Sequence, residues 1–164
     1  MRSLIVTSAL WIFCAAHARG DASVEGAKDN VPKALPDVLE QVAGGKLPLE
    51  PLVVLYDDLH PFHGGFWIAI HGDGKVEQDS KREKIGEPKK VSRADVLKLL
   101  ALVRKQRAWE QRTPDRAPVP DESRARLTIA WRDRQSVIWE WYNELAANKR
   151  VIEIRELMKQ IAWK

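Results

Sequence analysis

Cysteine is nearly absent from this sequence, and its single instance, Cys14, lies in an apolar run near the start of the chain. The run follows Arg2 and leads to Ala16-His17-Ala18, which has the form of an Ala-x-Ala cleavage site. We therefore expect residues 1–18 to be a cleavable signal peptide that directs the protein to a periplasmic or extracellular location. Because cleavage removes Cys14, the exported part has no disulfide, and a packed core must stabilise it.

Long hydrophobic segments are also missing. A membrane-spanning helix needs about 20 apolar residues, and the run from Leu4 to Ala16 is shorter. We expect no stable membrane insertion after cleavage, whereas an uncleaved signal would be retained as an anchor. Lipid attachment to Cys14 is disfavoured, since Phe13 replaces the small residue and Trp11 replaces the Leu that such sites carry.

An excess of charge of one sign is missing too. Lys and Arg total 27 against 23 Asp and Glu, which gives a net charge of +4, and the two signs are interleaved. Nucleic-acid-binding domains concentrate basic residues in a patch or stripe, so no nucleic-acid partner is expected. The sequence also lacks a Gly-x-Ser-x-Gly elbow and a Gly-rich phosphate loop that leads directly into a helix.

The mature chain divides into a lead-in and one domain. Residues 19–45 begin with small and charged residues without apolar periodicity, which is typical of a flexible segment. A short helix over residues 36–43 is compatible with Pro36 in its first turn and Gly44-Gly45 after its end. We expect residues 46–164 to form a single domain, because this length suffices for one hydrophobic core.

The centre of the domain is predicted to be a hairpin over residues 66–79, which follows a strand over residues 52–56. Its turn, Gly72-Asp73-Gly74, supplies residues that tolerate positive φ. A three-residue loop places Ile70 opposite Val76, whereas a two-residue loop would place it opposite a glutamate, so we expect the former. The residues that then face the core are Phe66, Ile68, Ile70 and Val76. Those that face outward are Trp67, Ala69, His71, Lys75 and Glu77.

A second hairpin is predicted further along the chain. Residues 126–131 alternate between apolar and polar, and residues 137–142 return with a similar pattern. Asp133-Arg134-Gln135 is expected to form the turn between them. The residues expected to share the core face are Leu127, Ile129, Trp131, Val137, Trp139 and Trp141.

Two long helices complete the domain. Ser92 and Asp95 form a capping pattern, and apolar residues recur at helical spacing over residues 96–103 and 151–161. The resulting order, βββαββα, predicts an α+β fold. It would be a two-layer sandwich, with an antiparallel sheet of about five strands and two helices on one face.

Several turn and cap residues of this domain follow a known pattern. A Gly-Gly loop precedes a strand, a Gly-Asp-Gly turn follows it, and Ser-x-x-Asp opens a Leu-rich helix ahead of a closing hairpin and helix. The positions over residues 52–163 are Gly64-Gly65, Gly72-Asp73-Gly74, Val76, Ser92, Asp95, Leu99 and Leu100. In these features the chain resembles an uncharacterised bacterial domain family of exported proteins and lipoproteins, a domain of unknown function. The resemblance implies this fold and an exported location, and it carries no catalytic residue.

The first candidate site is a cluster of metal-ligand residue types. The mature chain has three histidines, His60, His63 and His71, and the carboxylates near them are Asp57, Asp58 and Asp73. Imidazole and carboxylate groups bind zinc and similar divalent metals, so one hypothesis is a metal-dependent envelope enzyme or metal-binding protein. The alternative is that these are ordinary loop and strand residues and that the protein has no cofactor. Adjacent Asp57 and Asp58 should point to opposite sides of an extended chain, which favours turn formers over an acid and base pair.

The second candidate site is the sheet face that the helices leave uncovered. Its expected binding residues are Trp67, His71, Ile138 and Tyr142, beside Ala69, Thr128 and Ala130. An aromatic patch of this kind suits an envelope protein, a glycan or self-association. The alternative is that residues 31–46 cover the face. Because no catalytic constellation is recognisable, we expect a non-catalytic binding domain in preference to an enzyme.

Overall fold

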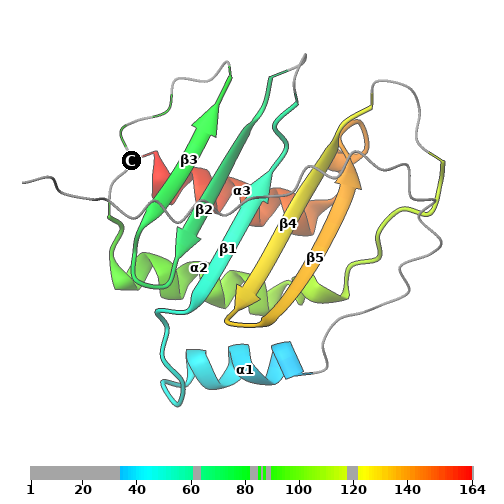
Figure 1. Ribbon diagram of the computed structural model, residues 1–164. Helices are drawn as coiled ribbons and strands as arrows, with labels where there is room; N and C mark the ends of the chain where they lie inside the picture. Colours follow the sequence, from blue (N-terminus) through cyan, green and yellow to red (C-terminus); the bar gives the residue numbers. More distant parts are fainter. Residues whose placement is uncertain are drawn as a thin grey trace, which may run out of the picture.

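The computed structural model describes residues 34–60, 64–81, 85, 87, 90–117 and 122–163. In chain order its elements are α1 (Ala34–Ala43), β1 (Leu52–Asp57), β2 (Phe66–His71), β3 (Val76–Ser80), α2 (Arg93–Lys105), η1 (Ala108–Glu110), β4 (Arg124–Trp131), β5 (Arg134–Trp141), η2 (Leu145–Ala147) and α3 (Lys149–Ala162). The strands form one open, five-stranded antiparallel sheet in the order β3-β2-β1-β4-β5. The long helices α2 and α3 lie behind this sheet in Figure 1, which confirms the predicted α+β fold.

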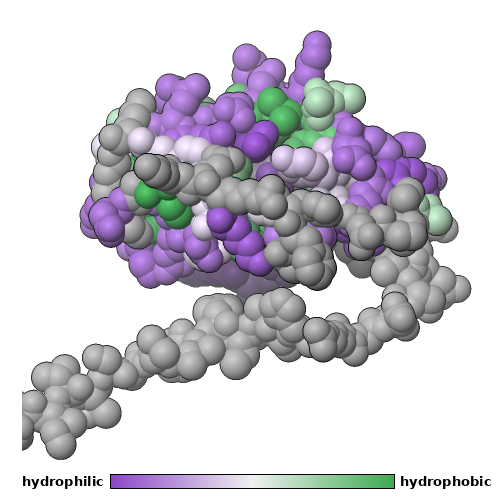
Figure 2. Space-filling model, turned by 90° about the horizontal axis from the view of Figure 1, so that it is seen from above, coloured by the Kyte–Doolittle hydropathy of each residue, from purple (hydrophilic) through white to green (hydrophobic). Residues whose placement is uncertain are grey.

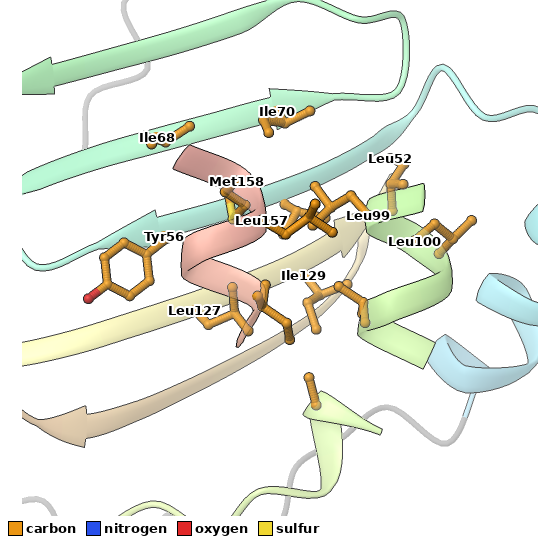
Figure 3. Close-up of a cluster of buried hydrophobic side chains, with 14 of the residues drawn as sticks. Leu52, Tyr56, Ile68, Ile70, Leu99, Leu100, Leu127, Ile129, Leu157 and Met158 are labelled. Carbon is orange, nitrogen blue, oxygen red and sulfur yellow. The ribbon is translucent and has the colours of Figure 1, made fainter. Parts of the chain in front are cut away.

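The core lies between one face of the sheet and the helices (Figure 3). Tyr56, Ile68 and Leu127 come from three neighbouring strands and belong to one buried cluster with Leu99 of α2 and Met158 of α3. All five side chains are fully buried. Burial of each large apolar side chain contributes about 1.5–3 kcal/mol, so this layer can stabilise a domain without disulfides.

The first helix also belongs to the core. α1 begins two residues earlier than predicted, at Ala34, and contacts α2 and the β4–β5 hairpin. Its Glu40 side chain accepts a hydrogen bond from Arg104 Nε of α2 at 2.8 Å. Residues 34–43 are therefore packed with the domain instead of forming a flexible lead-in. The residues that α1 buries are Leu35, Val38, Leu39 and Val42.

The β2–β3 hairpin has the predicted register. Ile70 pairs with Val76, and Ala69 pairs with Glu77, so the predicted division into core and outward residues is confirmed. Strand β1, at the centre of the sheet, buries every second residue. It therefore has one core face and one half-buried face.

The turn of this hairpin is in close contact with two other parts of the chain. A Cβ atom on Gly72 would lie 1.7 Å from the carbonyl oxygen of Leu49, in the segment before β1. Gly74 adopts φ +89° and accepts a hydrogen bond from Val91 N, just before α2, at 2.8 Å. The glycines are therefore needed both for their backbone angles and for the space that their neighbours occupy.

The β4–β5 hairpin has a different turn from the predicted one. Trp131 pairs with Arg134, so the loop consists of only two residues, Arg132 and Asp133. Arg132 adopts φ 54°, a left-handed conformation in which glycine is normally preferred. The loop is thus shorter than expected by one residue and lies one position earlier in the chain.

This change exchanges the two faces of β5, because neighbouring residues in a strand point to opposite sides. Ile138 pairs with Leu127 on the core face, where it is 3% exposed. The prediction that Val137, Trp139 and Trp141 share the core face is wrong, because all three point the other way.

Both long helices begin with a side-chain cap. Ser92 Oγ accepts from Asp95 N at 3.1 Å, as the sequence predicts, and Asn148 Oδ1 accepts from Val151 N at 3.2 Å. No helix within the described residues is long and apolar enough to cross a membrane. The predicted signal peptide, residues 1–18, lies outside the described part of the chain.

Candidate binding face and its cleft

The sheet face that points away from the helices, here called the open face, includes three cross-strand rows and, at one end, the pair of Arg124 and Trp141. The first row contains Asp79, Trp67, Asp57, Arg126 and Trp139. The second contains Glu77, Ala69, Leu55, Thr128 and Val137. The third contains His71, Val53, Ala130 and Gln135. Apolar and aromatic residues are thus interspersed with charged and polar ones on this face.

Two of the four predicted binding residues, Trp67 and His71, lie on this face, and a third, Tyr142, follows the end of β5. Trp67 and His71 are half-buried there, and Tyr142, directly after β5, is 45% exposed. The fourth prediction, Ile138, is wrong because that side chain belongs to the core. Its neighbour Val137 is on the open face instead and is 48% exposed.

Trp139 is the main residue of the open face that sequence reasoning missed. The alternation groups Val137, Trp139 and Trp141 on one side of β5, as the sequence predicts, but that side is the open face and not the core. The signal that could have corrected the assignment is the pairing of Ile138 with Leu127, which matches two large apolar residues. A three-residue turn would place Ile138 on the open face instead.

The described part of the N-terminal segment does not cover the open face. The buried residues of α1 join the same hydrophobic cluster as α2 and α3, and this cluster lies on the opposite side of the sheet. Residues 31–33 of the predicted covering segment lie outside the described residues. For residues 34–46 the covering alternative is therefore wrong.

The structure does not bring His60 and His71 together. His60 N donates to Gly64 O at 2.7 Å beside the start of β2, whereas His71 is the last residue of β2. A strand of this length separates its two ends by about 16 Å, which is too far for two ligands of one ion. His63 lies outside the described residues. Among the residues that are described, no three His, Cys, Asp or Glu side chains are grouped to hold a metal ion.

Asp57 and Asp58 point in opposite directions, as their spacing predicts. Asp57 Oδ1 accepts from Leu59 N at 3.0 Å. Asp58 is buried and accepts from Tyr56 Oη and from Phe66 N, both at 2.8 Å. Burial, together with the negative charge of Asp58, raises the pKa of Tyr56, so its hydroxyl remains a donor. Asp58 therefore links β1 to β2 and is unsuited to act with Asp57 as a catalytic pair.

His71 is held by the neighbouring strand. Its Nε2 lies 3.2 Å from Glu77 Oε2, and the same carboxylate hydrogen-bonds to Lys75 Nζ. The hydrogen bond from Lys75, with a smaller contribution from His71, holds the pKa of Glu77 below its usual value of 4.5. Glu77 is thus ionised at neutral pH and provides a partner for the imidazole within the hairpin.

A cleft of about 410 Å³ lies at one end of the open face, where β1 and β5 end and β4 begins. Figure 2 looks onto this end of the molecule, where hydrophilic surface predominates and apolar groups form separate patches. The residues that line the cleft are Asp57, Leu59, His60, Glu122, Ser123, Arg124, Arg126 and Trp141. Because they come from segments far apart in the sequence, only the strand order brings them together.

One wall of the cleft is a stack of arginine and tryptophan side chains. The Arg124 guanidinium lies 4.5 Å from the ring centroid of Trp139 and 4.9 Å from that of Trp141. Arg116, from the segment before β4, lies 4.6 Å from the Trp141 ring. These contacts help to explain why Trp141 is only 1% exposed, although it points away from the core.

Arg116 is fixed over Trp141 by two carboxylates. Its Nη1 donates to Glu122 Oε2 at 2.8 Å, and its Nε donates to Glu144 Oε1 at 2.7 Å. These hydrogen bonds, above all those to Glu122, raise the pKa of the guanidinium above its usual value. The charge of Glu122, whose side chain is almost fully buried, is therefore compensated within the protein.

In contrast to Arg116, three hydrogen-bond donors of the residues that line the cleft have no acceptor within the described part of the chain. Within the described residues, the guanidinium groups of Arg124 and Arg126 have no hydrogen bond and no carboxylate partner. Trp141 Nε1 is buried and also has no hydrogen-bond acceptor. An unsatisfied buried donor costs roughly 1–3 kcal/mol. The cleft can therefore accept a group that is rich in hydrogen-bond acceptors.

Comparisons with protein-family models, with curated proteins and with solved structures found no match to this chain. The site has two features that can bind a partner: the aromatic open face, and the donor-rich cleft at its end.

Proposed function

We propose that this protein is an exported, non-catalytic binding domain whose partner contacts the open face of the sheet. The observation that carries the proposal is the orientation of Val137 and Trp139, which point away from a core that the helices already fill. Trp67 lies in the same cross-strand row as Trp139 on this surface. Tryptophan and tyrosine contribute a large share of binding energy in protein interfaces, so such a surface favours association.

The partner that we propose is an envelope protein or a glycan. Indole and phenol rings bury a large area while losing few rotamers, and both partner classes can pack against them. The polar residues at the margin of the open face, Asp79 and Gln135 among them, are exposed and would form the hydrated rim that surrounds an apolar interface centre.

Export is supported by the sequence pattern of residues 1–18 and by the resemblance to domains of exported proteins. A core without disulfides is compatible with this proposal, because the helices and one sheet face bury enough apolar surface to stabilise the domain. Cleavage after Ala18 would leave the domain described above as the functional part. The mass of the protein recovered from the envelope would show whether the signal has been removed.

The proposal is tested with two substitutions on the open face, Trp67→Ala and Trp139→Ala. Each should reduce the capture of the partner from a native envelope extract by about tenfold or more, since it removes an aromatic anchor. Leu102→Ala is the matched control, because Leu102 is a half-buried apolar residue of α2, in the helix layer. Circular dichroism would establish that all three variants are folded.

The results distinguish the partner classes. Proteins that cross-link to the parent and to the control, but not to the open-face variants, would support a protein partner. Binding to isolated envelope polysaccharide with the same dependence would support a glycan. A shift to dimers in analytical ultracentrifugation would identify a second copy as the partner. If both open-face variants retain every interaction of the parent, the proposed use of this face is wrong.

A further inference from the structure

We infer that the cleft at the end of the open face is an oxyanion site, which binds a carboxylate or phosphate group through the guanidinium groups of Arg124 and Arg126. This inference rests on the proposed function, because the cleft opens on the same face and would hold one charged group of the same ligand. It adds the chemical class of that group.

The two arginines have the spacing that such a site requires. Arg124 and Arg126 are two residues apart on β4 and point to the same face, so their Cα atoms are about 7 Å apart. Side chains of this length can converge on one small group. Each guanidinium presents its donors in a planar fork that matches the paired oxygens of carboxylate and phosphate groups.

The aromatic stack prepares Arg124 for this role. With its guanidinium over the rings of Trp139 and Trp141, the side chain is held in place while its N–H groups remain at the edge of the stack. An immobilised fork loses less conformational entropy when it binds an anion. Trp141 lines the same cleft beneath Arg124, so its indole N–H signal reports on a group that binds there.

The carboxylates of the cleft do not cancel these positive charges. Glu122 is engaged by Arg116 through a bidentate ion pair. Asp57 accepts the backbone N–H of Leu59 and makes no ion pair with Arg126, its neighbour across the strands. Two guanidinium groups thus face a single uncompensated carboxylate within the described lining, which leaves the cleft positively charged.

The test is a titration of the ¹⁵N-labelled full chain with inorganic phosphate and, separately, with acetate, at ionic strength held constant with sodium chloride. The chain has 7 tryptophans, so the indole region of the NMR spectrum is simple, and Trp141→Phe identifies the signal of Trp141. We expect the Trp141 indole signal to move on addition of either anion and to saturate. A preference for one anion would show which oxyanion the site selects.

Substitutions then assign the donors. Arg126→Gln removes an exposed guanidinium and should weaken binding of the preferred anion by about tenfold. Arg124→Lys keeps the positive charge but removes the planar fork of donors. It should weaken binding of the anion by a similar factor, which shows whether the charge alone suffices. Arg150→Gln, an exposed arginine of α3, is the control and should leave the affinity unchanged.

Two outcomes would overturn the inference. One is an indole signal of Trp141 that neither anion moves. The other is an affinity that Arg126→Gln and Arg124→Lys leave unchanged while both variants remain folded. If instead the anion titration fails and Trp67→Ala still abolishes partner capture, only the oxyanion site is wrong and the binding face stands. If the anions bind but partner capture does not depend on Trp67 or Trp139, the oxyanion site stands and the proposed use of the open face is wrong.

Discussion

The two hairpins of this domain are built from similar sequence patterns, yet only one of them has the predicted register. In β2–β3 the loop of glycines places Ile70 opposite Val76, as expected. In β4–β5 the loop is shorter by one residue, and Ile138 exchanges sides with Val137. Because side chains alternate along a strand, a displacement of one residue transfers every side chain to the other face.

The difference teaches that the turn, more than the alternation, determines which face a strand presents. Gly72 and Gly74 mark their turn because no other residue fits the available space and backbone angles. The second turn contains no glycine, and Arg132 adopts the left-handed backbone conformation there.

The largest effect is expected at the first turn. Gly72→Ala would place a Cβ atom 1.7 Å from the carbonyl oxygen of Leu49, so the backbone must move. We expect the free energy of unfolding to fall by about 4 kcal/mol or more, measured by urea denaturation. Gly44→Ala is the matched control, since its Cβ would meet its nearest atom, Glu40 O, only at 3.4 Å. Equal losses in the two variants would show that the close approach at Gly72 does not matter.

An effect of intermediate size separates the two faces of β5. Ile138→Ala should lower the free energy of unfolding by about 3 kcal/mol, because it removes buried methyl groups and leaves a cavity. Val137→Ala, at the neighbouring position on the open face, should change it by less than about 0.5 kcal/mol. Chemical denaturation of both variants checks the register. A larger loss for Val137→Ala than for Ile138→Ala would instead support the three-residue turn.

The smallest effect is expected at the second turn, and it has the opposite sign. Arg132→Gly should raise the free energy of unfolding by about 0.5 kcal/mol, because glycine adopts the left-handed conformation without steric cost. The gain is reduced by the loss of the Arg132 guanidinium from its position 4.4 Å from the Trp131 ring. Thermal unfolding measures the change. Asp133→Gly, at a position without positive φ, should give no stabilisation, and a gain there instead would contradict this account of the turn.

The candidate site was predictable only in part. Trp67 and His71 could be placed on the open face because their own hairpin carries its turn signal in the sequence. The cleft could not be predicted, since Asp57, Arg126 and Trp141 become neighbours only when β1 pairs with β4. The grouping of His60 with His71 is wrong for a related reason: His60 lies before the start of β2 and His71 ends it, so an extended strand separates them.

By itself, the sequence determined the elements of this protein and the local features that begin and end them. Helical periodicity, the Ser92 cap and the glycine turn act over a few residues, so they can be recognised without knowledge of the remaining chain. Tertiary structure decided the strand order, the inclusion of α1 in the core and the face that β5 presents. These depend on pairing and burial between distant segments, which local spacing does not specify, and they determine where Trp139 and the cleft lie.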